Sequence, residues 1–221
     1  MAGVRARVRK RTSSVFRIPD FWSRARRSLS QRDPVLAGII RAHPAAALRA
    51  RGDPFQTLAR SIVGQQISVK AADSVWRRFL DAVVTVRPAA VLGTEAPTLR
   101  NCGLSQRKVE YLMEIARQFA NGAVNPGEWD MLDDETVIEQ LVRVRGVGRW
   151  TAEMVLIFGL LRPNVLPLDD LGLQRAVSLQ YFAGRRVSMR TIEKLARNWQ
   201  PWRSVATWYL WRSLDPVPVE Y

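Results

Sequence analysis

Cysteine and histidine are almost absent from this sequence. Its 221 residues include one cysteine, Cys102, and one histidine, His43. A single cysteine excludes an intramolecular disulfide, a Cys-ligated iron–sulfur cluster and a zinc knuckle. The lone histidine has no cysteine or acidic cluster around it, so a His-based triad or a His-rich metal site lacks partners, and we expect His43 to be a surface residue before Pro44. These absences favour a reducing compartment and a site without a metal.

Long apolar runs and acidic residues are also scarce. The longest wholly apolar stretches, such as MVLIFGLL at 154–161, fall far short of the roughly 20 residues that a membrane-spanning helix needs. Lys and Arg number 34 against 20 Asp and Glu, a formal net charge of +14, and the pI is about 11.2. Such a charge favours a polyanionic partner, either nucleic acid or an anionic membrane surface. Because no run could span a bilayer, we expect nucleic acid and no membrane.

The positive charge is concentrated at the N-terminus. The first 27 residues hold nine basic residues and one acid, Asp20, so they supply +8 of the +14. This pattern predicts a flexible basic arm over residues 1–27 that binds a polyanion, and two other interpretations stay open: a solubilising tail or an organelle transit peptide. The location is therefore left open between a bacterial cytoplasm with its nucleoid, a nucleus and an organelle.

Apolar residues recur at three- and four-residue spacing along most of the chain, and no alternating run of strand length appears. This periodicity predicts an all-α fold. The expected helices span 34–49, 54–82, 105–121, 134–143, 149–161, 170–182, 188–198 and 201–214. Capping residues mark the starts of five of them: Asp33, Asp53, Ser105, Asp133 and Ser188.

The stretch VRGVGRWTAEM at 144–154 joins two of the expected helices by a tight turn. The amides near Gly146, Val147 and Gly148 have no intrahelical acceptor, and the positive end of the second helix's macrodipole points the same way. Glycine lets a phosphate approach the backbone closely, and Arg145 and Arg149 add positive charge. The turn therefore predicts an anion site, although two glycines two residues apart also suit an ordinary helix-to-helix turn.

Two consecutive acids, Asp169 and Asp170, precede an expected helix in NVLPLDDLGLQRAV at 164–177. Only one of them can be the N-cap, so the other is expected in the first turn, where the macrodipole favours an ionised carboxylate. A carboxylate beside a phosphate-binding turn suits stabilisation of a positively charged sugar while a nucleotide's glycosidic bond breaks. The plainer alternative is that the pair only starts a helix.

Five segments together resemble the helix-hairpin-helix DNA glycosylases, and within them the 3-methyladenine DNA glycosylase II family of AlkA type. They are RSIVGQQISVKAA at 60–72, GLSQRKVEYLMEIA at 103–116, VRGVGRWTAEMVLIFGL at 144–160, LPLDDLGLQRAV at 166–177 and WQPWRSVATWYLW at 199–211. The resemblance covers roughly residues 54–214. It implies a two-lobed helical fold with the active-site cleft between the lobes, one built from 28–53 plus 163–221 and the other from 54–162, which ends in the helix-hairpin-helix.

The resemblance also implies roles for individual residues. The second acid, Asp170, matches the catalytic aspartate, which leaves Asp169 as the expected helix cap. Trp150 and Trp211 match the aromatic rings that line the base pocket. The hairpin residues expected to contact DNA are Arg145, Gly146, Val147, Gly148, Arg149 and Thr151.

The resemblance implies a wedge residue as well. A side chain at Gln66, or at its neighbour Ile67, would enter the gap that the extruded base leaves in the duplex, unless both residues only close a helix junction.

The implied activity is excision of alkylated purines, of the 3-methyladenine and 7-methylguanine class, from duplex DNA in base excision repair. Such a base already carries a positive charge and leaves without a general acid. Lyase-competent relatives carry a catalytic Lys at the position of Trp150, so we expect a monofunctional enzyme that acts as a monomer and needs no cofactor. Two alternatives stay open: a glycosylase for an oxidised or deaminated base, and a non-catalytic DNA-binding protein.

Overall fold

The computed structural model describes residues 18–49 and 53–214, and these residues form helices and loops with no strand. The all-α prediction is confirmed. None of the described helices is long and apolar enough to cross a membrane. The elements are α1 (Trp22–Arg32), α2 (Pro34–Ala42), α3 (Pro54–Gly64), α4 (Val69–Val83), α5 (Pro88–Leu92), α6 (Ala96–Asn101), α7 (Gln106–Ala120), η1 (Pro126–Met131), α8 (Asp134–Val142), α9 (Arg149–Met154), η2 (Val155–Gly159), α10 (Leu171–Phe182), α11 (Met189–Ala196), η3 (Arg197–Trp199) and α12 (Arg203–Leu214).

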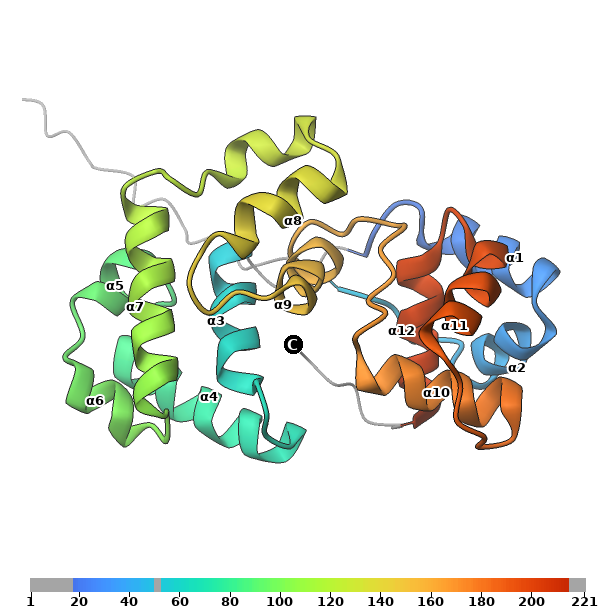
Figure 1. Ribbon diagram of the computed structural model, residues 1–221, viewed down its shortest axis with the longest axis horizontal. Helices are drawn as coiled ribbons and strands as arrows, with labels where there is room; N and C mark the ends of the chain where they lie inside the picture. The colour runs from blue at the N-terminus through green and yellow to red at the C-terminus, as the bar shows by residue number, and fades with distance from the viewer. Residues whose placement is uncertain (1–17, 50–52, 215–221) are drawn as a thin grey trace, which may run out of the picture.

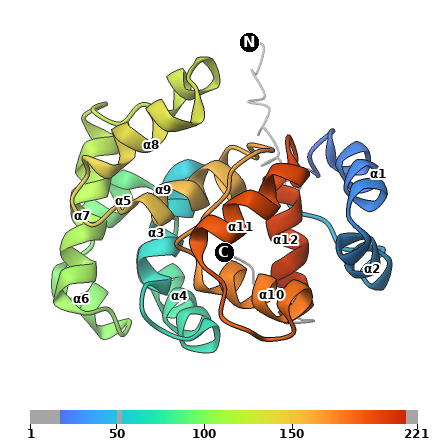
Figure 2. The ribbon, with the colours of Figure 1, turned by 45° about the vertical axis from the view of Figure 1, so that its right-hand side comes forward.

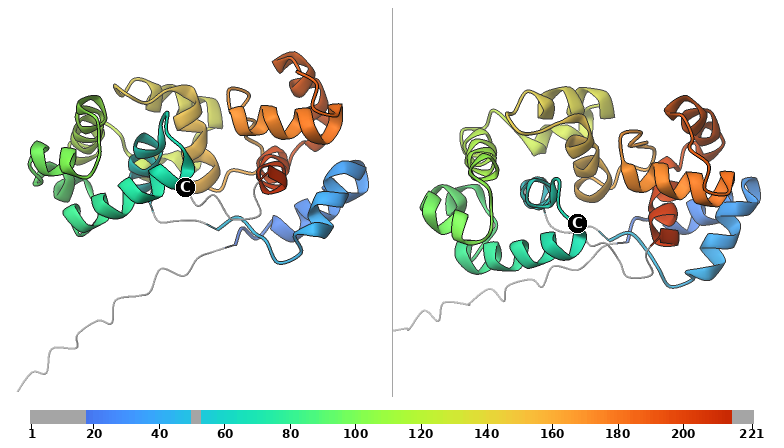
Figure 3. Two further views of the ribbon diagram at one scale, coloured as in Figure 1. Left: turned by 90° about the horizontal axis from the view of Figure 1, so that it is seen from below. Right: turned by 60° about the horizontal axis from the view of Figure 1, so that its bottom comes forward.

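The first and last helices pack beside each other. In Figure 1, α1 and α2 (blue) lie next to α10, α11 and α12 (orange to red), while α3 to α9 form the other side of the molecule. Figure 2 and both views of Figure 3 show the same two groups. The buried carboxylate of Asp33, before α2, joins the distant segments, because it accepts hydrogen bonds from the Tyr181 hydroxyl at 2.7 Å and the Trp199 indole N–H at 2.9 Å. The lobe boundaries, 28–53 plus 163–221 and 54–162, stay a prediction.

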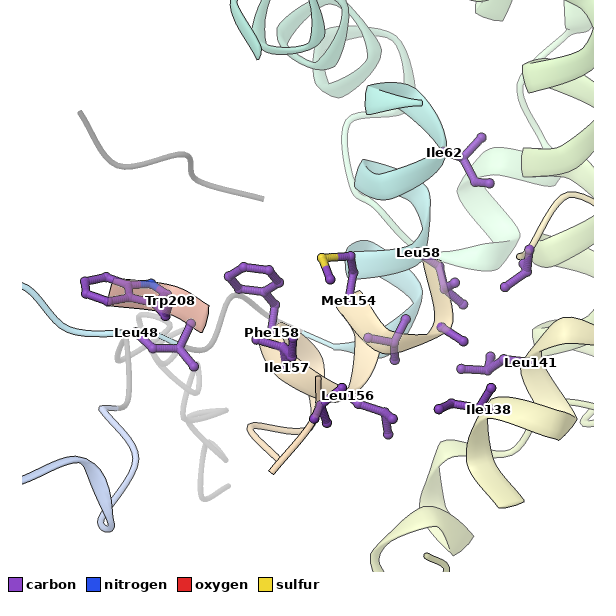
Figure 4. Close-up of a cluster of buried hydrophobic side chains, with 14 of the residues drawn as sticks. Leu48, Leu58, Ile62, Ile138, Leu141, Met154, Leu156, Ile157, Phe158 and Trp208 are labelled. Carbon is purple, nitrogen blue, oxygen red and sulfur yellow. The ribbon is translucent and has the colours of Figure 1, made fainter. Parts of the chain in front are cut away.

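The second helix of the hairpin runs through the core. Every side chain from 151 to 158, in α9 and η2, is buried. Figure 4 shows side chains of this segment among those of neighbouring helices, including Leu58 of α3 and Leu141 of α8. At its other end the Phe158 ring stacks on the Trp211 ring of α12, with centroids 5.8 Å apart. This segment therefore connects the two groups of helices and fixes the position of the hairpin.

The expected helix over 54–82 is two helices. α3 ends at Gly64 and α4 begins at Val69, because the Ser68 hydroxyl caps α4 by accepting a hydrogen bond from the Ala71 N–H at 3.3 Å. Between them Gln66 has a φ of +58°, in the left-handed region that non-glycine residues seldom adopt. The expected helix over 34–49 likewise ends early, at Ala42, since a residue before proline disfavours helical geometry.

The predicted arm over 1–27 is wrong in its last part. α1 begins at Trp22, and Trp22, Ala25 and Leu29 are buried. The Trp22 ring stacks against the Tyr209 ring, with centroids 5.6 Å apart. The arginines between these apolar positions obscured their helical spacing in the sequence. Residues 1–17 lie outside the described residues, so the rest of the arm stays a prediction.

Candidate active site

A cavity of about 650 Å³ lies between the α3–α4 region and the start of α10. In Figure 1, α3 and α4 lie to the left of α9 and α10 lies to its right. Three of the predicted site residues, Asp170, Trp150 and Ile67, line this cavity together. Its lining residues are Arg60, Gly64, Ile67, Ser68, Ala72, Trp150, Asp169, Asp170, Leu171, Gly172 and Arg175.

The Asp170 carboxylate is held by three N–H donors. The Trp150 indole N–H donates to Oδ2 at 2.8 Å, and the Trp211 indole N–H donates to Oδ1 at 2.7 Å. Oδ1 also accepts the backbone N–H of Leu173 at 2.6 Å. Asp170 is only 7% exposed, so both oxygens have a fixed direction at the cavity wall.

Asp170, and not Asp169, is the N-cap of α10. The Asp170 N–H donates to the Pro167 carbonyl at 3.0 Å, which closes a turn and starts the helix one residue later than expected. The expectation that Asp169 is the cap is therefore wrong. Asp169 is exposed and lies on the cavity wall.

The two predicted pocket tryptophans have different positions. Trp150 lines the cavity, but Trp211 is not among its lining residues, because it lies behind Gly172 and stacks on Phe158. A Cβ on Gly172 would lie 3.0 Å from Asp170 Oδ1 and 3.1 Å from the Trp211 ring. The Trp211 indole contacts Asp170, and its role as a second wall of the base pocket stays a prediction. The sequence signal for Gly172 was a glycine in the first turn of a helix, where other residues are better helix formers.

A glycine is needed at position 146 because the Tyr111 ring packs against it. Its φ is +93°, and a Cβ there would lie 2.2 Å from the Tyr111 ring. The Tyr111 contact was not foreseen, because nothing in the local sequence of either segment indicates it. Gly148 caps α9 in an extended conformation, and its Cβ position is open.

The remaining predicted hairpin contacts are only partly available for DNA. The Val147 side chain is buried, and its N–H already donates to the Val144 carbonyl at 3.0 Å. Thr151 is also buried, and its hydroxyl accepts a hydrogen bond from the Gln65 side chain at 3.3 Å. The structure thus leaves the amides of Gly146 and Gly148 as the anion-binding candidates, and Val147 and Thr151 contribute to packing.

The two hairpin arginines are paired with carboxylates. Arg149 makes a bidentate ion pair with Glu135 of α8, at 2.6 and 2.8 Å, and contacts Glu153 at 3.2 Å. Arg149 therefore joins α8 to α9, and its charge is already paired with these two carboxylates. Arg145 is more exposed and makes a longer contact of 3.3 Å with Glu110.

Glu153 is a buried acid on α9. Burial raises the pKa of its carboxyl to about 7, against the opposing effect of the nearby Arg149 guanidinium. One of its oxygens, Oε2, has no hydrogen-bond partner in the described structure.

The two wedge candidates differ in their position relative to the cavity. Ile67 is 40% exposed and lines the cavity, whereas Gln66 is exposed but does not line it.

None of the described lysines lines the cavity. The Lys108 ammonium donates to the carbonyls of Val63 and Gln65, at 2.9 and 2.8 Å, and burial lowers its pKa. In the described residues, no group of three His, Cys, Asp or Glu side chains could hold a metal ion.

The chain resembles known proteins in both sequence and fold. Residues 59–201 match the model of the HhH-GPD superfamily of base excision DNA repair proteins. The chain is 32% identical to DNA-3-methyladenine glycosylase 1 of Schizosaccharomyces pombe, over 73% of this chain and 72% of that protein. It is 29% identical to a putative DNA-3-methyladenine glycosylase of Bacillus subtilis, over 81% of this chain and 66% of that one.

A solved structure shows the same relationship. The Schizosaccharomyces pombe 3-methyladenine DNA glycosylase in complex with abasic DNA superimposes with a TM-score of 0.78 at 28% identity, covering 90% of this chain and 99% of that one. The chain therefore belongs to the HhH-GPD superfamily of base excision DNA repair proteins.

Proposed function

We propose that this protein is a monofunctional DNA glycosylase that removes alkylated purines, of the 3-methyladenine and 7-methylguanine class, from duplex DNA. The observation that carries the proposal is the Asp170 carboxylate, fixed by two indole N–H groups beside a cavity that Trp150 lines. Relatives that act on 3-methyladenine, by their names, in Schizosaccharomyces pombe and Bacillus subtilis support the substrate class.

The damaged base is extruded from the duplex into the cavity and stacks on the Trp150 ring. A cationic purine over an indole gains about 0.5–2 kcal/mol from the cation–π interaction, which a normal neutral base does not. This difference favours alkylated bases over undamaged ones.

Asp170 stabilises the positive charge that develops on the sugar as the glycosidic bond breaks, and it orients the water that attacks the sugar. Because both carboxylate oxygens are already fixed, little reorganisation is needed during the reaction. The base leaves with the electrons of the glycosidic bond, which neutralise its positive charge, so no general acid is required. The step uses no metal and no organic cofactor.

The protein holds DNA through the amides of Gly146 and Gly148, supported by Arg145, and acts as a monomer. Phosphate contacts of this kind carry affinity without sequence preference. The reaction stops at the abasic site, because a β-lyase needs an amine that attacks the sugar, and the described lysines do not line the cavity.

Chromatography of the bases released from methylated duplex DNA tests this proposal. The expected products are free 3-methyladenine and 7-methylguanine, with strands that break only after hot alkali. Release of only oxidised or deaminated bases from matched duplexes would favour another lesion specificity. DNA binding without release of any base would favour the non-catalytic alternative.

A further inference from the structure

The first turns of α10 present an apolar and a basic side chain on the cavity wall. Leu171 is 78% exposed, Arg175 is also exposed, and both line the cavity that holds Asp170. They are four residues apart in one helix, so their side chains lie on the same face. The buried residues of α10, Leu173, Ala176 and Val177, lie at other positions around the helix.

A single exposed leucine is ordinary on a protein surface, and the position of Leu171 is what distinguishes it. Leu171 directly follows Asp170, whose side chain caps the helix and fixes the backbone of the first turn. Ile67, 40% exposed, lines the same cavity from the α3–α4 link. Two exposed apolar side chains, one from each group of helices, therefore belong to the wall of one cavity.

Arg175 differs from the other arginines at the site. Arg60 is paired with Asp73, Arg149 with Glu135 and Glu153, whereas Arg175 makes no ion pair with any residue from 18–49 or 53–214. Its charge is available to a phosphate without the cost of breaking an existing pair.

We propose that Leu171 and Arg175, called the rim pair here, form a second DNA contact beside the base pocket. Leu171 packs against the sugar and base next to the extruded nucleotide, on the side opposite Ile67, and Arg175 binds the adjacent phosphate. Apolar side chains of this kind stabilise a distorted duplex by filling the space between unstacked bases. The inference rests on the proposed function, since it requires that DNA covers this cavity.

The two residues have different signatures in binding experiments. Each phosphate contact contributes about 0.9 to the slope of log affinity against log salt concentration, so Arg175→Gln should lower that slope by about this amount, for every DNA sequence alike. Arg41→Gln is the matched control, because Arg41 is an exposed arginine on α2 that does not line the cavity. It should change the slope much less.

Leu171→Ser should leave the salt slope unchanged. It should raise the half-saturating concentration of methylated duplex about tenfold, as expected for a lost leucine contact. The rate of base release at saturating DNA should stay the same, because the contact is present before and during the reaction. Leu171→Met should restore most of the affinity. Met131→Ser, at a 90% exposed methionine on η1, should have no effect.

Three results would overturn the rim pair. The first is an unchanged half-saturating concentration in Leu171→Ser. The second is a slower rate at saturation in Leu171→Ser with an unchanged half-saturating concentration, which would mean that Leu171 acts only through Asp170. The third is a salt slope for Arg175→Gln equal to that of Arg41→Gln. The wild-type protein separates this inference from the proposed function. Wild-type protein that bound no DNA would refute both, whereas normal wild-type binding with unaffected variants would refute the rim pair alone.

Discussion

The indole nitrogen of Trp150 lies 2.8 Å from Oδ2 of Asp170. The ring proposed to hold the damaged base therefore also holds the carboxylate proposed to release it. Binding of the base and orientation of the carboxylate therefore depend on one side chain. A substitution that keeps an aromatic ring but removes the N–H can separate these two roles.

Trp150→Phe should slow base release while leaving substrate binding nearly unchanged. The phenyl ring still stacks on the base, but Asp170 loses a donor worth about 1.5–3 kcal/mol, which corresponds to roughly a 10- to 100-fold lower rate if the loss falls on the transition state. Single-turnover kinetics with methylated duplex separate the rate at saturation from the half-saturating concentration. An effect on half-saturation alone would mean that the hydrogen bond has no role in the reaction.

Gly172→Ala should reduce activity by moving Trp211. Its new Cβ would approach Asp170 Oδ1 and the Trp211 ring to about 3 Å, so the indole must shift and its hydrogen bond to Asp170 lengthens. The matched control is Gly38→Ala in α2, where no atom lies within 4 Å of the new Cβ. That variant should stabilise the protein by about 0.5–1 kcal/mol and keep full activity, as measured by thermal unfolding and base release. Full activity in both variants would show that the position of Trp211 is unimportant.

Gly146→Ala should weaken DNA binding and destabilise the protein. The new methyl group would collide with the Tyr111 ring, and the φ of +93° is unfavourable for any residue with a Cβ. Gly148→Ala has an open Cβ position, so it should fold normally and test the close approach of phosphate. Reduced binding of undamaged duplex by Gly148→Ala, with unchanged unfolding temperature, is the expected result. A loss confined to one DNA sequence in that variant would argue against a phosphate contact.

Glu153→Gln should change how stability depends on pH. Burial raises the pKa of Glu153 from 4.5 to about 7, so the folded state binds more protons than the unfolded state between these values. The stability that protonation gives is fully present below about pH 4.5 and is lost as the pH rises through 7. Glu153→Gln removes this loss, and at pH 8 it should be more stable than the wild type by up to about 3 kcal/mol. Urea unfolding at pH 5 and pH 8 measures the difference, and equal pH dependence in the two proteins would contradict a buried, titrating Glu153.

Much of the helical structure could be predicted from local sequence. Asp33, Asp53, Ser105, Asp133 and Ser188 all cap helices as their spacing indicated. A cap and the amide that it binds are three residues apart, so both are visible in one short segment.

The site was less predictable because its contacts join distant segments. Trp211 reaches Asp170 across 41 residues, and Tyr111 determines why position 146 must be glycine. The family resemblance indicates the two tryptophans and the aspartate as site residues, but it does not indicate which of the two rings lines the cavity. The prediction of Asp169 as the helix cap is wrong for a different, local reason, since only the turn that the Asp170 N–H closes on the Pro167 carbonyl decides which of two adjacent acids starts the helix.

We propose that Asp170, held by Trp150 and Trp211, drives base release. Asn at position 170 can still cap the helix, but its amide removes the charge and leaves one indole N–H without an acceptor. At position 169 the same change removes none of the hydrogen bonds that hold Asp170, since Asp169 is exposed and is not the cap.

The most direct measurement is single-turnover release of 3-methyladenine from duplex DNA by the wild type, Asp170→Asn and Asp169→Asn, with binding to abasic-site DNA measured in parallel. We predict that Asp170→Asn releases no detectable base and still binds abasic DNA, while Asp169→Asn keeps most of its activity. An active Asp170→Asn, or a greater loss in Asp169→Asn, would contradict the assignment.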